Sequence, residues 1–190
     1  MLLRHGLSKR RFLLYVGGCD WRKNVEGMTQ GLAHARAQGE DLVLAFAGSL
    51  GPSHAAAVDA ATASAGVGGS VSKLGYVSDD DLAVLYRHAV AHVMVSRLEG
   101  FGLTVVEAMA SGCPVVTTTA GSLPEVAGDA ALTVDPEDPR AIGDAFVRLA
   151  RDASLRGELA AKGRARAPLF SREVQARAMA KVYRESERLV

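Results

Sequence analysis

A stretch of 22 residues, SRLEGFGLTVVEAMASGCPVVT at 96–117, constrains the fold more than any other part of the sequence. It follows an apolar run at 91–95 and ends in a β-branched run at 114–117. Between these runs lie a glycine-rich turn at 100–102 and a segment of helical composition at 103–110. This order predicts a strand, a turn, a helix and a second strand, which together form one βαβ unit.

The turn and the start of the predicted helix are suited to binding an anion. The first N–H groups of a helix have no partner within it and carry the positive end of its dipole. Glycines at that point let an anion approach the backbone closely. Glu99 and Glu107 bracket the turn, and carboxylates are good acceptors for the paired hydroxyls of a sugar. The pattern predicts a ligand with a diphosphate in the middle and a sugar at each end, as in a nucleotide-sugar.

The strings EGFG at 99–102 and EAMA at 107–110 resemble the E-x7-E signature of retaining glycosyltransferases of family 4. The resemblance implies that Glu107 holds the ribose and that Glu99 holds the transferred sugar. It also implies that the intervening backbone meets the diphosphate, at Gly100, Phe101, Gly102, Leu103 and Thr104. On the residues alone, the alternative is that Glu99 caps the helix and Glu107 is a solvated helical residue.

A second pair of candidate residues follows the first predicted strand, at 12–16. Arg22 and Lys23 lie in the turn after this strand, ahead of a helix predicted at 25–38 with Asn24 as its cap. Ligands of α/β folds bind at such turns, although two surface cations would look the same. The string YVG-x4-RKN is similar to one branch of family 4, which implies that both cations neutralise the donor diphosphate. The resemblance also places the nucleotide base against the backbone at Val77.

Strands and helices alternate through the chain, with further strands predicted at 42–47, 71–75 and 131–134. This alternation predicts an α/β fold, a Rossmann-like three-layer α/β/α domain with a parallel sheet of about six strands. We expect residues 1–11 to be a linker and 12–190 to form one donor-binding domain, which includes carboxyl-terminal helices over 154–189. The resemblance implies that this domain is the carboxyl-terminal half of a B-type glycosyltransferase.

We expect neither a metal nor a cofactor. Cys19 and Cys113 belong to no metal-ligand spacing, and the acidic run at 78–81 has the pattern of a helix cap. His88 and His92 have no zinc-like set of partners and are interpreted as structural.

Charge is unevenly distributed along the chain. Residues 140–190 carry 12 Lys and Arg against 6 Asp and Glu. The two signs alternate there, which favours solvated helix faces over nucleic-acid binding. Apolar runs fall short of the roughly 20 residues of a membrane span, and the first ten residues are too polar for a signal peptide. A cytoplasmic location is therefore expected, and peripheral membrane association of a whole enzyme stays open.

The resemblance implies a hexosyltransferase that uses a UDP- or GDP-sugar, of which this chain would be the donor-binding half. The acceptor-binding half, in the same or a separate chain, would be its partner, so we expect the isolated domain to be inactive. Two alternatives remain: a stand-alone nucleotide-binding module, and a sugar-nucleotide epimerase of the same architecture. The base, the sugar and the acceptor cannot be read from the residues.

Overall fold

The computed structural model describes residues 2–186. Its centre is one sheet of six parallel strands in the order β3-β2-β1-β4-β5-β6. The strands are β1 (Arg11–Val16), β2 (Leu42–Ala47), β3 (Val71–Gly75), β4 (Ala91–Met94), β5 (Val115–Thr118) and β6 (Leu132–Val134). Strand order reverses between β1 and β4, and a reversal of this kind opens a crevice at the carboxyl ends of the two strands.

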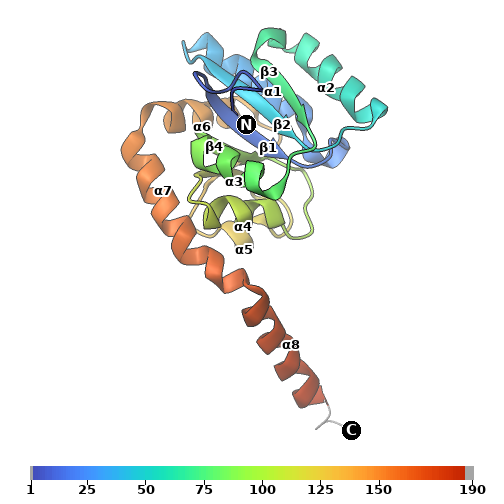
Figure 1. Ribbon diagram of the computed structural model, residues 1–190, viewed down its shortest axis with the longest axis vertical. Coiled ribbons are helices and arrows are strands. Elements are labelled where there is room, and N and C mark those ends of the chain that lie inside the picture. Colours follow the sequence, from blue (N-terminus) through green and yellow to red (C-terminus); the bar gives the residue numbers. More distant parts are fainter. Residues whose placement is uncertain (1, 187–190) are drawn as a thin grey trace.

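Helices cover both faces of the sheet (Figure 1), which confirms the predicted three-layer α/β/α architecture. They are α1 (Val25–Ala37), α2 (Pro52–Ser64), α3 (Asp79–His88), α4 (Leu103–Ala110), α5 (Leu123–Ala127), α6 (Pro139–Arg151), α7 (Ala153–Arg166) and α8 (Arg172–Ser186). Short 3-10 turns occupy Trp21–Lys23, Gly68–Ser70 and Ala167–Phe170. Within residues 2–186, the predicted and observed elements agree to within about two residues at their ends, the usual uncertainty of a helix boundary. The end predicted at 189 for the last helix lies outside the described residues.

The core lies against β1, β2, β4 and β5, whose apolar side chains are almost all buried. Such continuous burial is expected of parallel strands that are covered on both faces. Helices α1 and α6 approach closely at Gly31, where a Cβ would lie 2.7 Å from Cγ2 of Ile142. Leu7, from the segment ahead of β1, is also buried in this core.

Two predicted helix caps are present. Asn24 has a left-handed backbone with φ of 56°, and its side-chain oxygen accepts a hydrogen bond from the N–H of Gly27. The hydroxyl of Ser78 accepts a bond from the N–H of Asp81 at the start of α3. These bonds confirm that both residues are N-caps.

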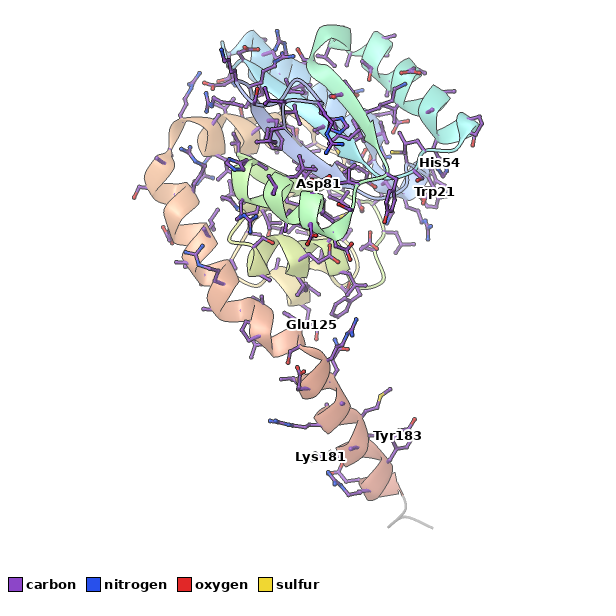
Figure 2. The ribbon with its side chains drawn as sticks, viewed as in Figure 1. Trp21, His54, Asp81, Glu125, Lys181 and Tyr183 are labelled. Atoms are coloured by element: carbon purple, nitrogen blue, oxygen red, sulfur yellow. The ribbon has the colours of Figure 1, made fainter. Side chains whose placement is uncertain are left out.

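The last helix extends away from the body of the domain, as Figure 1 shows. Its apolar residues Met179 and Val182 are exposed, and Lys181 and Tyr183 point outward from the same helix (Figure 2). Among the described helices, none is both long enough and apolar enough to cross a membrane.

Candidate functional site

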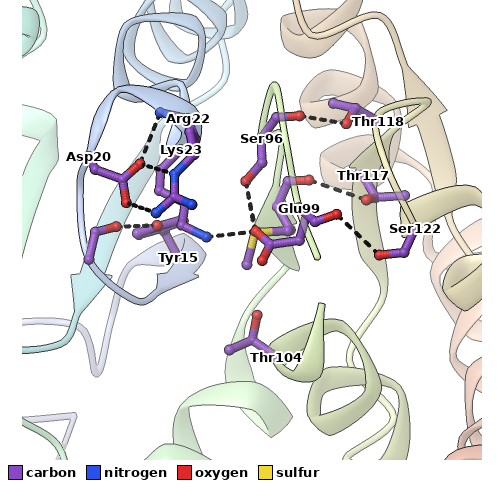
Figure 3. Close-up of polar contacts among 12 residues, drawn as sticks. Tyr15, Asp20, Arg22, Lys23, Ser96, Glu99, Thr104, Thr117, Thr118 and Ser122 are labelled. Atoms are coloured by element: carbon purple, nitrogen blue, oxygen red, sulfur yellow. Dashed lines mark hydrogen bonds and ion pairs between the residues drawn. The ribbon is translucent and has the colours of Figure 1, made fainter. Parts of the chain in front are cut away.

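The candidate site lies at the carboxyl ends of β1 and β4, where the strand order reverses. The loop after β1 and the loop after β4 are joined by a bond from the N–H of Arg97 to the carbonyl of Arg22, at 2.7 Å. The buried Tyr15 hydroxyl donates to the carbonyl of Gly18 (Figure 3). Both loops are therefore held in place by bonds to the backbone.

An ion pair links these two loops at the centre of the site. The Nζ atom of Lys23 lies 2.6 Å from Oε2 of Glu99 (Figure 3). The two side chains are only 18% and 17% exposed, so water screens their attraction less than at an open surface. Residues that the sequence assigned separately, 76 positions apart, are thus in direct contact.

The loop that carries Glu99 is supported by residues of the loop after β5. Gly121 has a left-handed φ of 57°, and a side chain there would overlap the carbonyl oxygen of Glu99. That carbonyl accepts a bond from the N–H of Ser122 at 3.4 Å, and the hydroxyl of Ser96 donates to the Glu99 carboxylate at 3.4 Å. Gly121 is needed for this close approach.

Arg22 differs from Lys23 in its surroundings. Its guanidinium forms two bonds with the Asp20 carboxylate, Nε to Oδ1 at 2.8 Å and Nη2 to Oδ2 at 3.1 Å. This partner holds the pKa of Asp20 below its usual range. Arg22 is exposed, and its charge is directed at Asp20 rather than at Glu99.

The amino terminus of α4 presents free backbone donors beside the ion pair. Gly102 precedes the helix with a left-handed φ of 92°, and its carbonyl accepts bonds from the next turn, starting at Val105. Within the described part of the chain, the N–H groups of Leu103 and Thr104 have no acceptor. A cavity of about 260 Å³ lies there, and its wall includes Gly17, Gly18, Lys23, Glu99, Phe101, Gly102, Leu103 and Thr104.

His92 forms a hydrogen bond with the first turn of α4 and holds it against the sheet. It is fully buried, and its Nδ1 lies 3.0 Å from the carbonyl oxygen of Leu14, to which it can only donate. The other nitrogen, Nε2, then accepts from the hydroxyl of Thr104 at 3.2 Å. Burial lowers the pKa of His92 to about 4, so the ring is neutral at pH 7. The structural interpretation of His92 is confirmed.

Glu107 lies one turn further along α4 and is exposed. The hydroxyl of Tyr86, from α3, lies 3.2 Å from its Oε2 atom. A hollow of about 350 Å³ lies beside this pair. Tyr86 was not among the predicted site residues, because the sequence showed it only as one apolar position of α3.

A third hollow of about 200 Å³ is lined by Val77, together with Tyr76 and Leu82. It shares Gly17 with the cavity at the start of α4 and Leu82 with the hollow beside Glu107. The three spaces therefore follow one another along this edge of the sheet. Among the described residues, no cluster of three or more His, Cys, Asp or Glu side chains could hold a metal ion.

The fold and the site together define a Rossmann-like α/β domain, with a helix amino terminus over the point where the strand order reverses. The chain belongs to the family described as glycosyl transferases group 1, whose sequence model matches residues 4–166. It corresponds to the carboxyl-terminal half of a B-type glycosyltransferase, as the resemblance implied.

Individual relatives agree with this assignment. The chain is 36% identical over 177 residues to the O-antigen chain mannosyltransferase B of Escherichia coli, covering 91% of this chain and 45% of that protein. The structure of sucrose-phosphate synthase from Thermosynechococcus elongatus matches with a TM-score of 0.84 and 29% identity, over 100% of this chain and 49% of that one. A carboxyl-terminal domain of a group 1 glycosyl transferase from Francisella tularensis matches with a TM-score of 0.73 and 23% identity, over 88% and 91%. The chain thus spans about half the length of two of these relatives.

Proposed function

We propose that this chain is the donor-binding half of a retaining glycosyltransferase that transfers a hexosyl group from a UDP- or GDP-sugar. The observation that carries the proposal is the position of the Lys23–Glu99 pair on the wall of the same cavity as the free N–H groups of Leu103 and Thr104. One ammonium and two amides there suit a diphosphate, and the adjacent carboxylate suits a sugar hydroxyl. The mannosyltransferase relative in Escherichia coli is consistent with a hexosyl donor.

The proposed mechanism is electrostatic. Negative charge grows on the diphosphate as the bond to the sugar breaks, and donors that are already in place stabilise that charge without reorganising. Lys23 and the α4 amino terminus supply this field, while Glu99 orients the sugar. In the free protein the Arg22 guanidinium is bound to the Asp20 carboxylate. It supplies a second cation to the diphosphate once these bonds break.

The rest of the donor lies along the adjoining hollows. We place the ribose at Glu107 and the base against the backbone of Val77. Leu82 lines both the hollow beside Glu107 and the hollow beside Val77, so the two positions are adjacent. In the free protein Lys23 is bound to Glu99. When the diphosphate binds, it also contacts the Lys23 ammonium, and a Glu99 oxygen becomes available to the sugar.

A titration with nucleoside diphosphate tests the two carboxylates separately, because UDP and GDP contain the ribose but lack the transferred sugar. Glu107→Gln should weaken their binding about tenfold or more, since a hydrogen bond to a charged group contributes roughly 1.5–3 kcal/mol. Glu99→Gln should leave it unchanged or slightly tighter, because Lys23 then loses its competing partner. Isothermal calorimetry measures both, with Glu173→Gln on the exposed helix α8 as the matched control. Equal losses for the two site variants would contradict the assignment.

The same cavity would also serve a nucleotide-binding module without transferase activity. The sugar separates the two functions, because only a transferase gains from holding it. Glu99→Gln should therefore weaken a complete UDP- or GDP-hexose relative to the plain diphosphate. If it weakens neither, the simpler binding module is the better description.

A further inference from the structure

Tyr86 is a buried side chain that forms a hydrogen bond with Glu107. Its ring is buried, with only 2% of its surface exposed, and its hydroxyl lies 3.2 Å from Oε2 of Glu107 and 3.3 Å from the carbonyl of Thr104. A phenol has one proton, and an ionised carboxylate is a stronger acceptor than an amide carbonyl. The proton is therefore donated mainly to Glu107. Burial raises the pKa of Tyr86 well above its usual value, and the Glu107 charge adds to this effect, so the phenol stays a donor.

The Tyr86 and Glu107 side chains differ in conformational freedom. The Tyr86 ring stands edge-on to the ring of His92, with centroids 5.5 Å apart and an angle of 79°, and His92 is itself bonded to β1. Glu107 is exposed on the surface of α4. An exposed glutamate samples several rotamers, and ordering it opposes binding by an entropic term. A bond from a rigid, buried donor reduces that freedom before any ligand arrives.

We propose that Tyr86 is a positioning residue that fixes the Glu107 carboxylate to receive the paired hydroxyls of the ribose. The inference rests on the proposed function, in which Glu107 holds the ribose. The Tyr86 bond takes one of about four acceptor positions on the carboxylate, and the others stay available. The adjacent hollow of about 350 Å³, lined by Tyr86, Glu107 and Ser111 among others, gives the ribose room.

The test compares a ribonucleotide with its counterpart that lacks both hydroxyls. UDP and GDP are titrated by calorimetry against wild type and Tyr86→Phe, beside 2′,3′-dideoxy-UDP and 2′,3′-dideoxy-GDP. Because Tyr86 acts only through Glu107, the variant should bind the ribonucleotides about three- to tenfold more weakly. Its affinity for the dideoxy compounds should not change.

Two controls separate positioning from a general effect on the fold. Tyr183→Phe removes the same hydroxyl from the exposed helix α8 and should leave all four affinities unchanged. In a Glu107→Ala background, Tyr86→Phe should cause no further loss, because the group that it positions is gone. Equal weakening of ribo- and dideoxynucleotides by Tyr86→Phe would assign Tyr86 a purely structural role and overturn the inference. Unchanged binding of the ribonucleotides would overturn it as well.

The outcomes also distinguish this inference from the proposed function. If wild type binds none of the four compounds, or binds ribo- and dideoxynucleotides equally, the ribose role of Glu107 fails and the Tyr86 inference fails with it. If wild type prefers the ribonucleotides through Glu107, and Tyr86→Phe keeps that preference in full, the proposed function stands and the inference alone is wrong.

Discussion

His92 illustrates how one buried side chain connects the sheet to the site. It donates to β1 through Leu14 and accepts from Thr104 in the first turn of α4. The bond from Thr104 requires a neutral ring, because Nε2 can accept only while it is unprotonated. The free N–H groups at the start of α4 are therefore held by a group whose protonation state depends on pH.

This dependence predicts a loss of stability in mild acid. Burial lowers the pKa of His92 from 6.5 to about 4 in the folded protein. Below pH 6.5 the unfolded chain takes up a proton that the folded chain does not, so the contribution of His92 is full above that pH and falls as the pH falls towards 4. Between pH 7.5 and pH 5 the free energy of unfolding should decrease by about 2 kcal/mol.

Urea unfolding across this range measures the effect. His92→Gln should be less stable than wild type at pH 7.5 and should lack this part of the pH dependence. His88→Gln, the same change at an exposed histidine, should keep the wild-type profile. Carboxylates with lowered pKa values, such as Glu40 and Asp144, lose their contribution to stability only below their usual pKa near 4, so they add little to the change between pH 7.5 and pH 5. If the His92 variant titrates as wild type does, the neutral-ring interpretation is wrong.

Residue roles were predictable where they depend on local sequence. Asn24 and Ser78 cap helices because their side chains bond backbone groups three positions away, and such bonds are visible in sequence. The Lys23–Glu99 and Tyr86–Glu107 contacts join positions 76 and 21 residues apart. They depend on how the sheet brings loops together, which one sequence does not specify. The Asp20 partner of Arg22 is local, yet the motif alone did not indicate it.

Among the helices, α4 shows why some elements were predictable. Its bounds, Leu103–Ala110, are those expected from the sequence, because glycines at both ends stop the helix and Gly102 needs a left-handed backbone that only glycine adopts readily. The carboxyl-terminal helices were also predicted, as far as the described residues extend. Where α8 would lie was not, because its apolar stripe can be covered only by a partner surface that the sequence does not identify.

The exposure of α8 predicts how the domain tolerates substitution. Met179 on α8 is 62% exposed, whereas Met109 on α4 is fully buried. Met179→Ala should therefore change the free energy of unfolding by less than about 0.5 kcal/mol. Met109→Ala, the same change in the core, should lower it by about 2–5 kcal/mol. Chemical denaturation of both variants measures the contrast. A comparable loss for Met179→Ala would show that α8 packs on the domain in solution, across the groove that includes Phe101 and Leu103.

The molecule as a whole presents its site at an open edge. The candidate residues lie at the carboxyl ends of the strands and on the first turns of α4, and the cavities that they line are open to the surface. The relatives from Escherichia coli and Thermosynechococcus elongatus are about twice as long as the segment that this chain covers. In our proposal, the other half of such a protein closes over the donor and carries the acceptor.

This view predicts that these 190 residues alone bind a nucleotide-sugar but transfer no sugar. Binding should be weak, because a diphosphate with water on one side gains less from Lys23 and the α4 amino terminus than one that is enclosed. Transfer needs both substrates held together in one geometry, and in our proposal the candidate residues bind only the donor. The purified chain is incubated with UDP- and GDP-hexoses and with lipid, sugar or protein acceptors, and products are followed by mass spectrometry. A two-domain member of the family serves as the positive control.

Slow hydrolysis of the donor agrees with the prediction, because water can reach the open site. Robust transfer without an added partner would show that this half of the fold binds its acceptor unaided.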